Sequence, residues 1–192
     1  MYENDRVSKK QSTKECIKTH FLDIYKTKPL RKITICDLIK VCNISRGTFY
    51  FHYEDIYALY HECENDLIKC LEGGLSDVNL STVRRDYHEH IKVFSSYLEK
   101  YIEHADIIKC FLTGSEGTSF RKAWLQSINQ GFSKPMEFSA DMTPSKRYLL
   151  TLFYSGGIRA VLSHWVLEGC REEPENIANI QAQILYQGMF SK

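Results

Sequence analysis

The chain has 192 residues, and its 25 Lys and Arg against 24 Asp and Glu give a formal net charge of +1. No apolar run approaches the roughly 18 residues that a membrane helix needs, and the first residues lack the apolar stretch of a signal peptide. Composition therefore argues against a membrane protein, and we expect a cytoplasmic location.

Apolar residues recur at three- and four-residue spacing along the first half of the chain, which predicts helices. A first helix ends near Pro29, a second covers about residues 34–42, and a third covers 45–53. A longer fourth helix begins at Ile56, and we expect the glycine pair at 73 and 74 to stop it.

The same period continues through the second half. Five further helices are predicted at about 81–101, 105–112, 120–128, 143–169 and 174–189. Ser81 is the expected N-cap of the first of these, and Thr143 followed by a proline is an N-cap signature for the fourth. Since no alternating strand pattern appears, the sequence predicts an all-α fold of about nine helices.

Charge is distributed unevenly along the chain. Residues 6–52 carry eleven Lys and Arg against three acidic residues, a net charge of +8, whereas residues 53–192 carry −5. A basic N-terminal segment followed by an acidic remainder is typical of a protein whose N-terminal segment binds a polyanion. A solvated basic surface explains the same pattern, so charge alone does not decide the function.

The segment from residue 34 to 53 reads Thr-Ile-Cys-Asp-Leu-Ile-Lys-Val-Cys-Asn-Ile-Ser-Arg-Gly-Thr-Phe-Tyr-Phe-His-Tyr. Asn43 lies between two short predicted helices and tolerates the left-handed conformation of a tight corner. Ser45 is placed to cap the second helix, and Gly47 in its first turn allows close approach of a partner. This arrangement is typical of a DNA-reading helix-turn-helix.

The same segment closely resembles the DNA-binding domain of the TetR/AcrR family of transcriptional regulators. The match is strongest in Ser-Arg-Gly-Thr-Phe-Tyr-Phe-His-Tyr, residues 45–53, and extends over about residues 9–60. It implies an N-terminal three-helix DNA-binding domain over 1–55 and a larger C-terminal helical domain for regulation and dimerisation over 56–192. It also implies a homodimer on double-stranded operator DNA, acting as a repressor that a small-molecule inducer releases.

The resemblance assigns roles to individual residues. The implied DNA-binding residues are Thr34, Ser45, Arg46, Gly47, Thr48, Tyr50, Phe51 and His52. Arg46 and Thr48 would read bases, whereas Tyr50 and His52 would hold phosphates. Base contacts carry sequence specificity, and phosphate contacts set position and affinity.

Three positions depart from the family pattern. Asn43 stands where a glycine is usual, Ile56 stands where a lysine usually contacts phosphate, and Cys36 stands where some members place a base-contacting polar side chain. We expect three basic residues to compensate for the missing phosphate contact: Lys9, Lys10 and Lys32.

The second half supplies two further predictions. The expected dimer interface, formed in the family by the last two long helices of each subunit, comprises Leu152, Gly156, Gly157, Ile177, Ile180, Ile184 and Leu185. The aromatic residues that could line an inducer pocket are Phe94, Tyr97, Tyr101, Phe111, Phe120 and Trp124. Each set also has a simpler interpretation, which is packing within the core of one chain.

Other kinds of site are not supported by the residue pattern. Seven cysteines, an odd number without a Cys-x-x-Cys pair, argue against a disulfide framework or a zinc knuckle, so we expect reduced and mostly buried thiols. Cys36 and Cys42 are interpreted as packing residues, with redox sensing as the alternative. His88 and His90 are two residues apart and point to different sides of a helix, and we interpret them, with His104, as separate surface histidines.

We therefore predict no metal site and no cofactor. Ser155-Gly156-Gly157 lacks the strand that a nucleophile elbow needs, which argues against an enzyme. The remaining alternative to an operator-binding regulator is an adaptor that acts through protein partners, suggested by Cys36 and Ile56.

Overall fold

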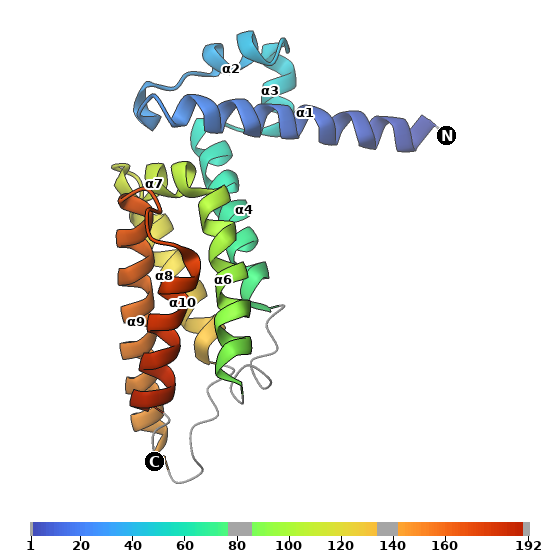
Figure 1. The fold of residues 1–192 in the computed structure, drawn as a ribbon. Helices are drawn as coiled ribbons and strands as arrows, with labels where there is room; N and C mark the ends of the chain where they lie inside the picture. The colour runs from blue at the N-terminus through green and yellow to red at the C-terminus, as the bar shows by residue number, and fades with distance from the viewer. Residues whose placement is uncertain (1, 77–85, 134–141, 190–192) are drawn as a thin grey trace. The chain divides into compact units, whose positions relative to one another are not determined.

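The computed structural model describes residues 2–76, 86–133 and 142–189, and within these ranges the regular elements are all helical (Figure 1). The α-helices in chain order are α1 (Tyr2–Tyr25), α2 (Ile35–Val41), α3 (Arg46–His52), α4 (Ile56–Ser76), α6 (Tyr87–Glu103), α7 (Ala105–Thr113), α8 (Thr118–Ser133), α9 (Pro144–Leu167) and α10 (Pro174–Gln183). A short 3₁₀ turn, η1 (Leu30–Lys32), precedes α2, and a π-helical segment, η2 (Ile184–Met189), follows α10. The all-α prediction is confirmed.

The chain divides into two compact units. The first consists of residues 1–67 with 114–116, and the second of residues 68–113 with 117–192. The division falls within α4, beyond the domain boundary predicted in front of residue 56. Among the described helices, none has the length and apolar character that crossing a bilayer requires.

The N-terminal unit packs α1, α2, α3 and the start of α4 around a small core. Its fully buried members, each with no exposed surface, are Ile17, Phe21, Leu38, Phe49, Leu59 and Tyr60. Tyr60 of α4 extends this core, because its ring meets that of Tyr25 edge-on at a centroid distance of 5.6 Å. At the edge of this core, Nζ of Lys18 on α1 lies 2.9 Å from Oδ2 of Asp66 on α4. The short helices α2 and α3 are thus held by tertiary packing, which helices of this length need.

The C-terminal unit is built on α6–α10, and α6 packs closely along α10 (Figure 1). Thr143 caps α9 as predicted, because its hydroxyl accepts a hydrogen bond from the Lys146 amide at 3.3 Å. The positive φ of 79° at Gly169 ends the helix where the sequence placed its end. Pro174 occupies the first turn of α10, also as predicted.

Three predicted helix ends differ from the structure. The helix α4 continues through the glycines at 73 and 74 to Ser76, so the cost of two glycines, about 1 kcal/mol each, does not end it. The last helix changes to π-helical geometry at Ile184 instead of running unbroken to Met189. Ser81 lies outside the described residues, and the N-cap of α6 is Asp86, whose carboxylate accepts from the amides of His88 and Glu89.

The aromatic residues predicted to line an inducer pocket instead form a packed cluster. All six are buried, and they are Phe94, Tyr97, Tyr101, Phe111, Phe120 and Trp124. Phe111 stacks on Phe120 at 5.1 Å, and Phe120 stacks on Trp124 at 5.9 Å. The simpler interpretation of these residues, as packing within the core of one chain, therefore fits the structure better.

Polar atoms inside this cluster satisfy one another. The Tyr101 hydroxyl accepts from the Trp124 indole N–H at 3.1 Å and shares a hydrogen bond of 2.7 Å with the Tyr97 hydroxyl. We expect Tyr101→Phe to destabilise the chain by about 1–3 kcal/mol, since it leaves two buried polar groups unpaired. Tyr97→Phe is the matched control and should cost less, because Tyr101 still accepts from Trp124. Urea unfolding of both variants measures the difference, and equal losses would contradict this assignment.

Candidate nucleic-acid interface

The first helix of the helix-turn-helix starts at a complete capping box. The Thr34 hydroxyl accepts from the Asp37 amide at 3.2 Å, and the Asp37 carboxylate accepts from the Thr34 amide at 2.8 Å. Lys28 reaches the same carboxylate at 2.7 Å. The hydrogen bonds from Lys28 and Thr34 lower the pKa of Asp37 to about 2. The side chains of Lys28, Thr34 and Asp37 thus fix the start of α2.

This cap predicts a pH-dependent contribution to stability. The Asp37 pKa is lower in the folded chain than its ordinary value of 3.8, so its contribution is present above about pH 4 and is lost as the pH falls toward 2. At pH 7 we expect Asp37→Asn to cost about 0.5–1 kcal/mol.

Urea unfolding of the N-terminal unit at several pH values checks this prediction. The difference between the native chain and Asp37→Asn should shrink below pH 4. Asp23→Asn is the matched control, since the ion pair that Asp23 makes among the described residues is with Lys26, just after the end of α1, at 3.3 Å. A pH-independent difference for Asp37→Asn would argue against the charged cap.

The corner between α2 and α3 has the geometry that the sequence predicts. Asn43 adopts a positive φ of 49°, a conformation that asparagine tolerates better than most residues. Ser45 then caps α3, because its hydroxyl accepts from the Thr48 amide at 3.0 Å and lies 2.8 Å from the Thr48 hydroxyl. Both caps and the corner lie within twelve residues of one another, so local sequence is enough to set them.

The helix α3 has an inward and an outward side. Phe49 is fully buried, as predicted, whereas Arg46 is exposed, and Tyr50 and Phe51 keep 51% and 67% of their surface accessible. A methyl group at Gly47 would meet only the Ser45 hydroxyl at 3.7 Å, so the chain's own packing does not require a glycine there. Large aromatic side chains exposed beside an arginine and an open glycine form a surface suited to a partner.

The remaining predicted contact residues lie on or next to this surface. Thr34 and Ser45 are exposed, and Thr48 and His52 are half-buried. The hydroxyls of Thr34 and Ser45 accept the capping hydrogen bonds of α2 and α3, so both residues have a structural role in addition to any contact with a partner. The contacts of these residues with DNA stay predictions.

The positive charge of the N-terminal unit is partly neutralised within the unit. Lys14 pairs with Glu62 at 2.8 Å, and Lys18 pairs with Glu15 and Asp66. Lys26 is exposed but pairs with Asp23 at 3.3 Å. The other described basic residues of this unit that are exposed are Arg31, Lys32, Lys40 and Arg46. The positive charge available to a partner therefore lies on η1, α2 and α3. The side chains of residues 9 and 10 lie outside the described part of the chain.

Two departures from the family pattern have a structural explanation. Ile56 is 9% exposed, so its side chain belongs to the core of the N-terminal unit and the lysine usual at this position is replaced by an apolar packing residue. Cys36 is exposed on α2, where it leaves a thiol on the surface instead of a polar side chain.

Several expectations for cysteines and histidines are wrong. Of the seven free thiols only Cys63 is buried, whereas four are half-buried and those of Cys36 and Cys70 are exposed. His90 is not a surface residue: it is 5% exposed and hydrogen-bonded to Gln181, and burial lowers its pKa. Gln181 also bonds the Tyr154 hydroxyl. The sequence missed this buried polar group because its members lie on α6, α9 and α10.

Beside this polar group lies an apolar hollow of about 330 Å³ in the C-terminal unit. Its walls come from α6, α9, α10 and η2, and they include Phe94, Phe153, Ile158, Val161, Ile177, Ile180 and Ile184, with Tyr154 and Gln181. Of the six aromatic residues predicted for a pocket, only Phe94 lines this hollow.

The residues predicted for the dimer interface separate into two groups. Ile177 and Leu185 are 6% and 7% exposed, so packing within the chain already uses them. Leu152, Ile180 and Ile184 are exposed, and so are neighbours that the prediction omitted: Tyr148, Leu149, Phe153 and Val161. We call these seven residues the α9–α10 apolar face. Added methyl groups at Gly156 or Gly157 would meet nothing within 4 Å, so no other segment that the structure describes packs closely there.

The capped corner, the exposed side of α3 and the separate helical C-terminal unit together define a helix-turn-helix transcription regulator. A TetR-type family model, described as a transcriptional regulator C-terminal region, matches residues 89–187. This match covers more than half of the chain. The chain therefore belongs to the TetR family of transcriptional regulators.

Solved structures of low sequence identity share the fold. A transcriptional regulator from Aquifex aeolicus is 21% identical, with 90% of this chain and 99% of that chain covered and a TM-score of 0.66. The dihydroxyacetone kinase operon activator DhaS is 14% identical, with 93% and 96% covered and a TM-score of 0.67. NalD, the secondary repressor of the MexAB-OprM efflux pump in Pseudomonas aeruginosa, is 14% identical, with 95% and 98% covered and a TM-score of 0.64. Curated protein sequences gave no match.

Proposed function

We propose that this regulator binds operator DNA as a homodimer, through the exposed side of α3. The observation that carries the proposal is the two-sided character of α3. This seven-residue helix buries Phe49 on one side and exposes Arg46, Tyr50 and Phe51 on the other. Arg46 would donate to base edges in the major groove, and the aromatic residues would contact the backbone and thymine methyl groups. Gly47 supports close approach, since a side chain there would project toward the DNA.

The dimer part of the proposal rests on the α9–α10 apolar face. Phe153 keeps 79% of its surface accessible and Leu149 keeps 61%, on the same helix as the two open glycines. A second copy of the chain packed on this face would bury these side chains and bring its own helix close to Gly156 and Gly157. Two α3 helices about 34 Å apart would then match the two halves of a palindromic operator.

Titration of the region upstream of the chain's own gene tests DNA binding. Fluorescence anisotropy with the full chain should show sequence-selective binding whose affinity falls steeply with salt, because several phosphates are neutralised. Equal affinity for an unrelated duplex of the same length, or no binding at low salt, would overturn the proposal.

Release by a small molecule is the second step of the proposed function. The apolar hollow is a better candidate for the ligand site than the aromatic cluster. Its volume lies near the lower end of the range for ligand pockets, and Gln181 and Tyr154 place polar atoms beside it. A ligand in it would lie beside the α9–α10 apolar face and could shift the dimer. The proposed action is repression, as in NalD, whereas the structurally similar DhaS is an activator.

The second candidate function is an adaptor that acts through a protein partner. It is favoured by the loss of the usual phosphate-contacting lysine at Ile56 and by the exposed thiol of Cys36. Absence of salt-sensitive DNA binding, combined with retention of the dimer, would favour it over the operator-binding regulator.

A further inference from the structure

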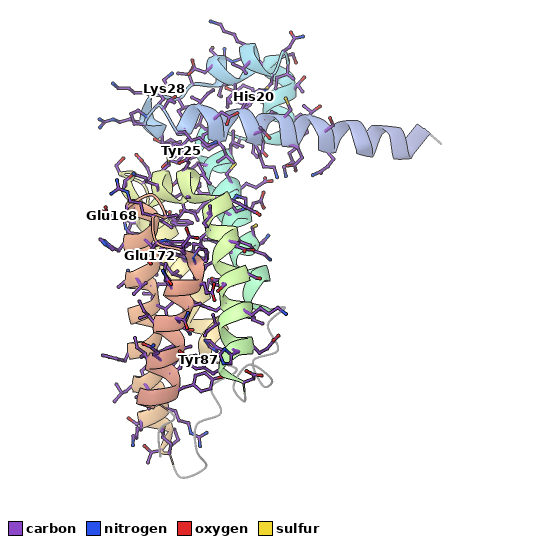
Figure 2. All side chains as sticks on the ribbon, viewed as in Figure 1. His20, Tyr25, Lys28, Tyr87, Glu168 and Glu172 are labelled. Carbon is purple, nitrogen blue, oxygen red and sulfur yellow. The ribbon has the colours of Figure 1, made fainter. Side chains whose placement is uncertain are left out.

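Three side chains of the N-terminal unit bring metal-binding atoms together. Cys16 and His20 are four residues apart on α1 and therefore lie on one face of that helix. Cys42, at the C-terminal end of α2, approaches the same face, with its sulfur 3.8 Å from the Cys16 carbonyl oxygen. The two sulfurs and an imidazole nitrogen all lie within 4.8 Å of one another, and all three residues are half-buried. Figure 2 labels His20 on α1.

We propose that Cys16, His20 and Cys42 form a binding site for a thiophilic metal ion, with Zn²⁺ as the matching class. Two thiolates and one imidazole suit Zn²⁺, which binds sulfur at about 2.3 Å and nitrogen at about 2.0–2.1 Å in tetrahedral geometry. Neighbouring ligand atoms are then about 3.5–3.8 Å apart. Since the three atoms already lie within 4.8 Å, an inward movement of about 1 Å completes the geometry.

Binding replaces the protons of two thiols by the metal. Each Cys sulfur forms a bond to the ion as its proton passes to water, and His20 donates the lone pair of a neutral ring nitrogen. The two negative charges of the thiolates balance the charge of a divalent ion. Half-burial leaves the fourth position open to water.

The position of the site gives the ion a structural effect. Cys42 directly precedes Asn43, the positive-φ residue of the corner between α2 and α3. An ion held by Cys16, His20 and Cys42 joins α1 to this corner and restricts the start of α3. This inference does not depend on the identity of the partner of α3, so its failure would leave the proposed function intact.

Titration of the reduced, metal-free full chain with Co²⁺ tests the site. Bound Co²⁺ should give a sulfur-to-metal charge-transfer band and visible bands typical of tetrahedral coordination, saturating at one equivalent and disappearing when Zn²⁺ is added. Cys16→Ser, His20→Gln and Cys42→Ser should each weaken binding by more than about 10-fold, since loss of outer partners alone costs that much. Circular dichroism checks that each variant is folded.

Cys36→Ser is the matched control, because Cys36 is an exposed thiol on the same helix α2 and lies outside the cluster. It should bind Co²⁺ like the native chain. No charge-transfer band, or a band that survives all three ligand substitutions, would overturn the proposal. Mass spectrometry supplies a further contrary outcome: a Cys16–Cys42 disulfide that forms equally in His20→Gln, with no metal uptake after reduction, would show a redox pair instead.

Discussion

Arg46→Ala should weaken binding of the proposed full-length dimer to its operator by at least about 30-fold. Arg46 is exposed in the first turn of α3, and a well-placed arginine contact to a base edge contributes about 1–3 kcal/mol. A symmetric dimer carries two copies, so the loss should reach about 2–6 kcal/mol. Anisotropy titrations against the operator and an unrelated duplex should show a much larger loss on the operator, because base contacts carry the specificity.

The matched control is Arg171→Ala, which removes the same charge from an exposed position in the C-terminal unit. It should change the affinity for both duplexes only slightly. Equal losses for Arg46→Ala on the operator and on the unrelated duplex would mean that Arg46 contributes only charge. If Arg46→Ala kept the native affinity for both duplexes, α3 would not be part of the DNA-binding surface.

The helix-turn-helix could be predicted in detail because its determinants are local. The Thr34–Asp37 box and the Ser45–Thr48 cap each join residues three apart, and Asn43 supplies its own positive φ. Short-range hydrogen bonds of this kind can be predicted from the residue types and their spacing in the sequence. The predicted and observed bounds of α2 and α3 therefore agree closely.

Features that depend on distant packing could not be predicted in this way. The Tyr154–Gln181–His90 group joins three helices, and its members gave no signal in the sequence. The aromatic residues of α6–α8 had the right period for a helix face, but period alone does not show whether rings line a cavity or fill it.

The metal cluster illustrates the same limit. Cys16 and His20 form a pair four residues apart in the sequence, yet Cys42 joins them only because α2 folds back across α1. Likewise, the pair of glycines after Leu71 looked like a helix end, whereas α4 continues past them to Ser76. Tertiary packing can outweigh a local penalty of about 2 kcal/mol.

Phe153→Asp should convert the proposed dimer to a monomer at micromolar concentration. Phe153 is 79% exposed on α9, and it lies on the α9–α10 apolar face. Burying a phenylalanine side chain contributes about 1.5–3 kcal/mol, and a symmetric interface counts it twice. An aspartate removes this contribution and adds the cost of dehydrating a carboxylate, so the dimer dissociation constant should rise by more than about 100-fold.

Sedimentation of the native chain, Phe153→Asp and a control shows whether this face holds the dimer. The matched control is Ile102→Asp, which places the same charge at a 43% exposed apolar position on α6 of the same unit. The control should stay dimeric. Phe153→Asp should also lower the affinity for the operator, although α3 is unchanged. In a dimer, binding of one α3 to its half-site raises the effective concentration of the second α3 at the other half-site, and a monomer loses this gain. A native chain that is monomeric would overturn the proposed dimer. A Phe153→Asp chain that stays dimeric would place the contact between subunits outside the α9–α10 apolar face.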